Sequence, residues 1–502
     1  MRVAIVGAGF SGIAMGIALR REGIEDFSIF ERAPDIGGVW LHNTYPGAAC
    51  DVPSYLYSYS YAQRRDWTRP CSPQAEILDY LHDTAREHGV AEKVRTDTEI
   101  ARADFDESAN RWTLETLAGE RITADALILA CGQLSRPAWP DIPGRDEFAG
   151  PSFHSAEWED EHDLRGRRVA VIGTGASAIQ FVPPLAEQVA QLDVYQRSPP
   201  WMLPRRNPGY PGWARALIRR VPGLQALRRK GMLAFMESGI VGQTRIPALS
   251  LLLRAWSSAF MRRQVRNPEL RRQIWPDYPI GCKRVLFSSA YLPALQRPNV
   301  ELVSERIARI TARGVLMADG REREVDCIVY GTGFKTHQFV APMEVAGVGA
   351  RTLEHAWADG AEAHLGLSVA GFPNMFLLYG PNTNLGFGSI IVMIEAQVGY
   401  VIDALRTLRR TGADALDLRP EVQAASAAAV QQRLRNSVWM GCQSWYRQES
   451  DGKVTNNWPG QMLEYVRATR RLRAEEYRLV YPHGQVVREP GAPVAGGASA
   501  AS

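Results

Sequence analysis

Two glycine-rich turns constrain what this chain can fold into, because each lies between a short apolar run and a helical pattern. The apolar runs, residues 3–6 and 169–172, suit buried strands of a parallel sheet. The small residues at equivalent positions of the two turns are Gly7, Gly9 and Gly12, and Gly173, Gly175 and Ala178. Such a turn lets a pyrophosphate approach backbone N–H groups at a helix N-terminus. The sequence therefore predicts an α/β fold with two dinucleotide-binding, Rossmann-like domains.

The residue that follows the next strand predicts which dinucleotide each domain binds. Counting 24 residues on from Gly7 reaches Glu31, and counting 24 on from Gly173 reaches Arg197. A carboxylate at this place hydrogen-bonds a ribose 2′-hydroxyl, whereas an arginine accommodates a 2′-phosphate. FAD and NADPH are the simplest pair that meets both requirements. Arg32, which follows Glu31, is assigned to the FAD site as well.

Changes in pattern along the 502 residues divide the chain into five segments. They are 1–145 (first part of the FAD-binding domain), 146–164 (interdomain linker), 165–325 (NADPH-binding domain), 326–489 (return to the FAD-binding domain and C-terminal part) and 490–502 (disordered tail). Residues from about 201 to 280 form an inserted lobe of arginine-rich amphipathic helices. Solvated arginines on a structural lobe explain this pattern, and so does a patch that binds a membrane surface or a partner.

Charge, cysteine and histidine usage argue against several classes of function. The net charge of +4 is small and the basic residues are spread out, so nucleic-acid binding has little support. The six cysteines are scattered without a CxxC pair, which suits a cytoplasmic protein and indicates neither a zinc ribbon nor a dithiol centre. The first strand at residue 3 is expected to leave no room for a signal peptide, and no apolar run approaches the ~18 residues of a transmembrane segment. The histidines do not cluster, so no metal site is expected.

Four further motifs lie between and after the two turns. Residues 148–158 (FAGPSFHSAEW) fit the pattern FxGxxxHxxxW, and residues 37–51 (GGVWLHNTYPGAACD) fit [A/G]GxWxxxx[F/Y]P[G/M]xxxD at every fixed position. Residues 330–334 (YGTGF) are similar to an ATG-type motif, and residues 281–284 (GCKR) are similar to a segment that carries an active-site arginine. Together they resemble the class B flavoprotein monooxygenases, and the tryptophan of the first motif resembles the Baeyer–Villiger branch. The resemblance extends to about Tyr481.

The resemblance implies an enzyme that inserts one oxygen atom of O2 next to a ketone carbonyl and gives an ester or lactone. NADPH would reduce FAD, and the reduced flavin would form a C4a-peroxyflavin that attacks the carbonyl. Arg284 is the fixed cation that such anionic chemistry needs, and Asp51 is its orienting partner. Trp40 and Tyr45 are expected to pack near the flavin. The further cofactor-binding residues are Gly38 and Gly333, Lys283 for the NADPH phosphate, and Trp445 towards the nicotinamide.

Two departures from the family pattern keep another reaction open. Glu159 follows the fingerprint where proline is usual, and residues 289–292 lack the acidic residue and paired tyrosines of some relatives. Oxygenation of sulfur or nitrogen is the alternative within enzymes, and a non-catalytic NADPH-responsive flavoprotein is the alternative outside them. His154 is interpreted as a structural histidine rather than a general base. A bulky apolar or aromatic ketone would suit the aromatic side chains of Trp439, Trp445, Tyr446 and Trp458.

Overall fold

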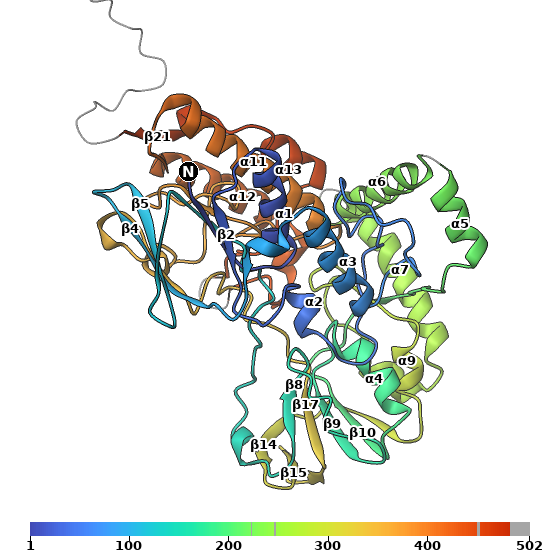
Figure 1. Cartoon of the computed structure of the whole chain (residues 1–502). Coiled ribbons are helices and arrows are strands. Elements are labelled where there is room, and N and C mark those ends of the chain that lie inside the picture. Colours follow the sequence, from blue (N-terminus) through green and yellow to red (C-terminus); the bar gives the residue numbers. More distant parts are fainter. Residues whose placement is uncertain (222, 245–246, 449–451, 482–502) are drawn as a thin grey trace, which may run out of the picture.

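The chain folds into two α/β domains, and a helical lobe projects from the second (Figure 1). A computed structural model describes residues 1–221, 223–244, 247–448 and 452–481. The predicted disordered tail, 490–502, lies outside the described residues. No helix in the described part of the chain is long and apolar enough to cross a membrane.

The first domain is built on a parallel sheet that begins with the strand before the first glycine turn. Its strand order is β19-β7-β1-β2-β3. The strands are β1 (Val3–Val6), β2 (Phe27–Phe30), β3 (Val94–Arg95), β7 (Ala126–Leu129) and β19 (Met375–Leu377). All neighbours pair in parallel, so their carboxyl ends meet at one edge, where the turn after β1 and the residue after β2 come together.

Helix α1 (Phe10–Arg21) lies in the centre of this domain. Nine of its 12 residues are buried, because it packs on the sheet and against α11 (Ile390–Thr411), which comes from the far end of the chain (Figure 1). The other helices of the domain are α2 (Val39–His42), α3 (Gln74–Glu87), α10 (Leu353–Ala356), α12 (Pro420–Arg435) and α13 (Met462–Ala468). Outlying strands are β4 (Ile100–Asp106), β5 (Arg111–Thr116), β6 (Arg121–Ala124) and β18 (Glu344–Ala346), and the pair β20 (Ala415–Leu418) and β21 (Tyr477–Val480).

The second domain repeats the parallel arrangement in the order β13-β10-β9-β17-β8. Its strands are β8 (Ser152–His154), β9 (Arg168–Ile172), β10 (Gln191–Tyr195), β13 (Val300–Val303) and β17 (Cys327–Tyr330), with a meander of β14 (Ile307–Thr311), β15 (Gly314–Met317) and β16 (Glu322–Glu324). Strand β8 lies inside the segment predicted as a linker, and β17 lies beyond the boundary predicted at residue 325. Pairing of β17 with both β8 and β9 joins segments far apart in sequence, and composition does not reveal such pairing.

The helical lobe lies between two short strands, β11 (Met202–Leu203) and β12 (Leu286–Phe287), which pair in parallel. Its helices are α5 (Gly212–Arg220), α6 (Leu224–Thr244), α7 (Pro247–Gln264) and α8 (Pro268–Gln273), and α9 (Tyr291–Ala294) follows β12. Arg229 of α6 anchors the lobe to the first domain, because its Nη1 donates to the carbonyl oxygens of Tyr55 at 2.8 Å and Ser58 at 2.9 Å.

Candidate functional site

The first glycine turn has no room for side chains at two of its small positions. Gly7 has a φ of +106°, and a Cβ there would lie 2.5 Å from the carbonyl oxygen of Ala130. A Cβ on Gly12 would lie 1.9 Å from the carbonyl oxygen of Gly7. Among the described residues outside the turn, only the backbone of Gly38, a predicted site residue, lies within 4 Å of a Cβ built on Gly9. The turn therefore keeps the N-terminus of α1 clear of side chains, which fits a bound pyrophosphate.

Glu31 follows β2 at the same edge of the sheet. Its side chain is 7% exposed, and its carboxylate accepts hydrogen bonds from the amides of Ala8 at 2.7 Å and Ala33 at 3.0 Å. Glu31 thus contacts the glycine turn directly, as a residue that binds the adjoining ribose must. Arg32 is exposed and donates to the carbonyl oxygen of Ser135 at 2.8 Å.

The second glycine turn packs against residues 330–334, the segment similar to the ATG-type motif. Gly173 has a φ of +113°, and a Cβ there would lie 2.4 Å from the carbonyl oxygen of Gly331. Gly331 in turn faces Ala178, the third small residue of the turn, because a Cβ on Gly331 would lie 3.3 Å from that of Ala178. Gly175 and Gly333 are open. A Cβ on Gly175 would meet its first neighbour at 3.9 Å, and one on Gly333 would meet no atom of the described residues within 4 Å. This open space suits the pyrophosphate of a second dinucleotide.

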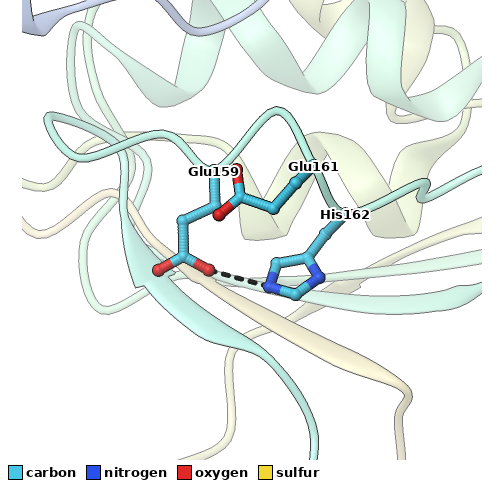
Figure 2. A group of neighbouring side chains, drawn as sticks. All are labelled: Glu159, Glu161 and His162. Carbon is cyan, nitrogen blue, oxygen red and sulfur yellow. Dashed lines mark ion pairs between the residues drawn. The ribbon is translucent and has the colours of Figure 1, made fainter.

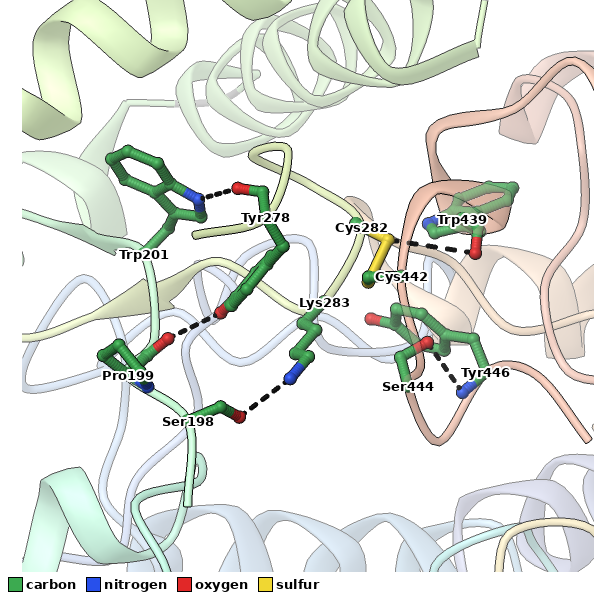
Figure 3. The surroundings of a disulfide bond; sticks show 10 residues. All are labelled: Ser198, Pro199, Trp201, Tyr278, Cys282, Lys283, Trp439, Cys442, Ser444 and Tyr446. Atoms are coloured by element: carbon green, nitrogen blue, oxygen red, sulfur yellow. Dashed lines mark hydrogen bonds between the residues drawn. A yellow bond between two sulfur atoms is a disulfide. The ribbon is translucent and has the colours of Figure 1, made fainter. Parts of the chain in front are cut away.

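Two cations lie beside the second turn. Arg197 is exposed after β10, and Lys283 donates from Nζ to the hydroxyl of Ser198 at 2.8 Å (Figure 3). Burial lowers the pKa of Lys283, and the charge of Arg197 lowers it further. Among the described residues, no carboxylate lies within ion-pair distance of either side chain. A phosphate dianion would relieve this repulsion, so the pair fits the 2′-phosphate of NADPH.

An ion pair joins the two domains. Arg284, just before β12, donates to Oδ2 of Asp51 from Nη2 at 2.6 Å and from Nε at 3.2 Å. The Asp51 charge raises the pKa of Arg284 and outweighs the opposite effect of burial. Burial raises the pKa of Asp51, but the charge and hydrogen bond of Arg284 and the charge of Arg205 bring it below its ordinary value. The structure therefore holds a permanent cation whose orientation a carboxylate fixes.

Three further residues surround this pair, of which the sequence analysis named only Tyr446, as a side chain suited to the substrate. Arg205 donates to the carbonyl oxygen of Cys50 at 2.5 Å. Tyr446 and Tyr379 both raise the pKa of Arg284, and burial raises the pKa of Tyr446 to about 12. Tyr379 begins the sequence YGPNTN and has a φ of +61°, an uncommon backbone for tyrosine that points to a functional turn. No sequence signal marks Arg205.

Aromatic side chains connect the fingerprint motif with the motif at 37–51. Trp158 packs against Phe181 of α4 (Ala178–Ala186), with ring centroids 5.5 Å apart, and Phe181 packs against Tyr45 at 5.7 Å. Tyr45 thus contacts the second domain, and its expected place near the flavin stays a prediction. Trp40 stays in the first domain, where its Nε1 donates to the hydroxyl of Tyr57 at 3.2 Å.

The domains also meet through backbone. A Cβ on Gly47 would lie 2.8 Å from the carbonyl oxygen of Gln180, and the Ala49 amide donates to the Gln180 side chain at 2.8 Å. A cleft of about 730 Å³ opens beside this contact. Its walls include Arg205 but neither Arg284 nor Asp51, and the charge of Arg205 also lowers the pKa of Asp51.

His154 of the fingerprint is completely buried in β8, where it pairs with Tyr330 of β17. Its Nδ1 accepts a hydrogen bond from the amide of Ala156 at 3.1 Å, and its ring packs against that of Phe334, with centroids 5.9 Å apart. Burial lowers the pKa of His154 to about 4, so the ring is neutral near pH 7. These contacts suit a structural histidine.

A disulfide between Cys282 and Cys442 connects the arginine segment to the C-terminal part of the chain (Figure 3). The two cysteines are 160 residues apart in sequence, so scattered spacing gave no sign of the bond. It counts against the reducing environment that the spacing suggests. Trp445 follows closely and is partly buried, with its ring centroid 4.2 Å from that of Tyr446.

The fold also gathers three side chains that the sequence analysis did not connect with a metal. Glu159, Glu161 and His162 place one possible ligand atom each within 4.8 Å of one another (Figure 2). Glu159, which directly follows the fingerprint motif, forms an ion pair with His162 at 2.9 Å. Glu161 and His162 are exposed, and surface groups of this kind commonly pair without a metal, so we assign none here.

These features define a class of protein. One glycine turn lies beside a buried carboxylate, the other lies beside two cations, and an ion pair from both domains lies between them. That combination defines an oxidoreductase built for two dinucleotides. A sequence profile described as "Pyridine nucleotide-disulphide oxidoreductase" matches residues 4–220, which contain both turns.

Comparison with known proteins gives the family. The chain is 43% identical over 480 residues to a Baeyer-Villiger monooxygenase of Pseudomonas aeruginosa, a match that covers 95% of this chain and 91% of that protein. Its structure is similar to an oxidized steroid monooxygenase bound to NADP (TM-score 0.85, 31% identity, 96% of this chain and 99% of that chain). It is also similar to OTEMO in complex with FAD and NADP (TM-score 0.86, 25% identity, 96% and 99%). The chain belongs to the Baeyer–Villiger monooxygenase family of flavoproteins, which confirms the predicted fold class and enzyme class.

Proposed function

We propose that this protein uses FAD, NADPH and O2 to insert one oxygen atom next to a ketone carbonyl, giving an ester or lactone. The ion pair of Arg284 and Asp51 at the domain junction is the observation that supports this most directly. When bound, FAD supplies the oxygen chemistry and NADPH supplies the hydride. The residues of this chain supply position and fixed charge.

Arg284 stabilises negative charge that develops on the carbonyl oxygen. Its raised pKa keeps the guanidinium charged at any working pH. Its hydrogen bonds to Asp51 come from Nε and Nη2, so the carboxylate does not engage Nη1. A preorganised donor of this kind is typically worth about 3–4 kcal/mol. Asp51 is a positioning residue, because it acts through Arg284.

The two turns divide the cofactors between the domains. We assign FAD to the first turn, through Gly7, Gly9 and Gly12 with Glu31, and to the adjoining Arg32, Gly38 and Trp40. We assign NADPH to the second turn, through Gly173, Gly175 and Ala178 with Arg197, and to Lys283, Gly333 and Trp445. The charge of the side chains supports the division, since a carboxylate at one turn and two cations at the other suit a hydroxyl and a phosphate respectively.

The test compares products and flavin reduction in the FAD-loaded enzyme. Bulky apolar or aromatic ketones and matched sulfides are incubated with NADPH and ¹⁸O2, and the products are analysed by mass spectrometry. We expect an ester or lactone carrying one ¹⁸O, and a loss of ester formation of about 100-fold in Arg284→Ala while NADPH still reduces the flavin anaerobically. Arg351→Ala, an exposed arginine of the first domain, is the matched control.

Each outcome has a distinct meaning. An unchanged ester yield in Arg284→Ala would contradict the role of Arg284. Labelled sulfoxide without any ester would show heteroatom oxygenation instead. A flavin that NADPH never reduces would contradict the proposed function as a whole.

We also propose that the protein acts in the cytoplasm. Four cysteines are unpaired in the structure, which suits a reducing compartment, although the Cys282–Cys442 disulfide argues the other way. Cell fractionation followed by thiol alkylation tests this directly. Recovery of the protein from an oxidising compartment, with no alkylated Cys282 or Cys442, would contradict the proposal.

A further inference from the structure

The helical lobe carries most of the large apolar side chains that lie exposed. In the described part of the chain, 14 such side chains are exposed, and eight of them belong to the lobe. The eight, which we call the lobe face, are Trp213, Leu217, Val221, Leu227, Phe235, Leu251, Leu252 and Trp256. Each is at least 41% exposed, and Trp213 reaches 72%. Apolar exposure concentrated in one part of a protein indicates an interaction surface.

These side chains form stripes rather than isolated exposures. On α5, Trp213 and Leu217 are four residues apart, and Val221 follows α5 at the same spacing. On α7, Leu252 and Trp256 are also four residues apart. Residues at this spacing share one side of a helix, so each helix turns an apolar stripe outward.

The charge of the three helices that carry the lobe face is almost entirely positive. Residues 212–264 contain ten of the 58 basic residues of the chain and one of its 54 acidic residues, so this segment carries +9 and the rest of the chain −5. The single acid, Glu237, is 6% exposed and accepts a hydrogen bond from the amide of Leu463 at 2.8 Å. In the described residues, the exposed charges on α5, α6 and α7, the helices that carry the lobe face, are therefore all positive, and the exposed acid Glu269 lies on α8. The lobe also projects at the periphery of the molecule, clear of both sheets (Figure 1).

We propose that the lobe face binds the surface of an anionic lipid bilayer. Helices that lie in the membrane interface typically expose tryptophan and leucine beside arginine and lysine. Their apolar side chains enter the boundary between headgroups and acyl chains, and their cations contact anionic lipid headgroups. A second copy of the chain is a poorer occupant, because it would bring two surfaces of +9 together. An acidic protein partner is the remaining alternative.

A row of phenylalanine rings leads from the lobe face towards the interdomain cleft. The ring centroids of Phe235 and Phe387 are 6.2 Å apart, and those of Phe387 and Phe287 are 6.3 Å apart. Phe287 lines the cleft. If the proposed oxygenation holds, binding to a bilayer favours ketones that dissolve in lipid, and this extension alone rests on that function.

The experiment measures binding of the FAD-loaded protein to sedimenting vesicles. One set of vesicles is phosphatidylcholine alone, and the other contains phosphatidylglycerol as well. We expect binding to the anionic vesicles that weakens as salt is raised, and at least a tenfold loss of binding in the triple variant Trp213→Ser, Leu217→Ser, Trp256→Ser and in Arg219→Glu, Arg220→Glu. Leu117→Ser with Leu463→Ser, which are exposed leucines outside the lobe, is the matched control and should bind as the parent does.

Flavin content, thermal melting and the rate of flavin reduction by NADPH confirm that each variant is folded, and these readouts are independent of lipid. Equal binding of the triple variant and the parent would overturn the proposal, as would the absence of binding to anionic vesicles at low salt. Self-association in light scattering that the triple variant abolishes, without vesicle binding, would assign the face to a second copy instead. Binding of an acidic protein but of no vesicle would assign it to a protein partner.

Discussion

The two glycine turns share one backbone design and differ in what surrounds them. At the first turn, Glu31 is buried and already bonded to two amides of the protein. At the second, Arg197 is exposed, and its charge and that of Lys283 repel each other. We expect the first arrangement to retain its dinucleotide and the second to take up and release one, because only the second gains charge neutralisation each time a phosphate arrives.

The largest expected effect concerns the third small residue of each turn. A Cβ on Gly12 would lie 1.9 Å from backbone, whereas the second turn already carries Ala178 at the equivalent place. We expect Gly12→Ala to abolish FAD retention and to reduce the free energy of unfolding by about 3 kcal/mol or more. The matched change, Ala178→Gly, should cost only about 1 kcal/mol. Chemical denaturation and the flavin-to-protein absorbance ratio measure both, and equal effects would show that the two turns are equivalent.

A smaller effect is expected from removing a charged side chain at either site. Arg197→Ala and Lys283→Ala should each raise KM for NADPH by about 10–100-fold, because each removes a charge-assisted contact, and should leave KM for NADH and the FAD content unchanged. Glu31→Gln should do the reverse, lowering FAD retention with little change in KM for NADPH. Steady-state kinetics with both nucleotides and flavin release on dilution provide the measurements. A loss of FAD in Arg197→Ala would refute the division of labour.

The smallest effect is a pH dependence at the segment that connects the domains. Burial lowers the pKa of His154 to about 4 in the folded state, below its ordinary value. As pH falls from about 6.5, the unfolded chain therefore binds a proton before the folded chain does, and stability is lost towards pH 4. Relative to pH 7, His154 should cost about 1 kcal/mol at pH 5.5, and His154→Asn should remove this part of the pH dependence. Urea denaturation at several pH values tests it, and an unaltered slope in His154→Asn would contradict the assigned cause.

The sequence predicted the parts of the fold that local pattern controls. Both glycine turns, the residues that follow the next strands, and the helical lobe could be recognised because each depends on neighbours in the chain. The association of Arg284 with Asp51 came from family resemblance, and the structure brings the two side chains together.

What the sequence did not reveal depends on contacts between distant segments. Strands β8 and β17 pair residues that are 176 positions apart in sequence, from Ser152 with Ile328 onwards, and no local pattern records this. Cys282 and Cys442 are individually unremarkable, and only the fold makes them neighbours. Tyr45 was assigned to the flavin by its motif, yet its contact with Phe181 depends on how the two domains meet.

Strands β11 and β12 give the lobe a property that its helices do not have. Met202 pairs with Leu286 and Leu203 with Phe287, so the chain leaves and re-enters the second domain at one place. Because its two ends are held side by side, such an insertion can change in length and in surface composition without altering the spacing of those ends. Arg284 lies two residues before the start of the returning strand. Substitutions and insertions in the lobe can therefore change which external surface it binds, while the position of Arg284 stays the same.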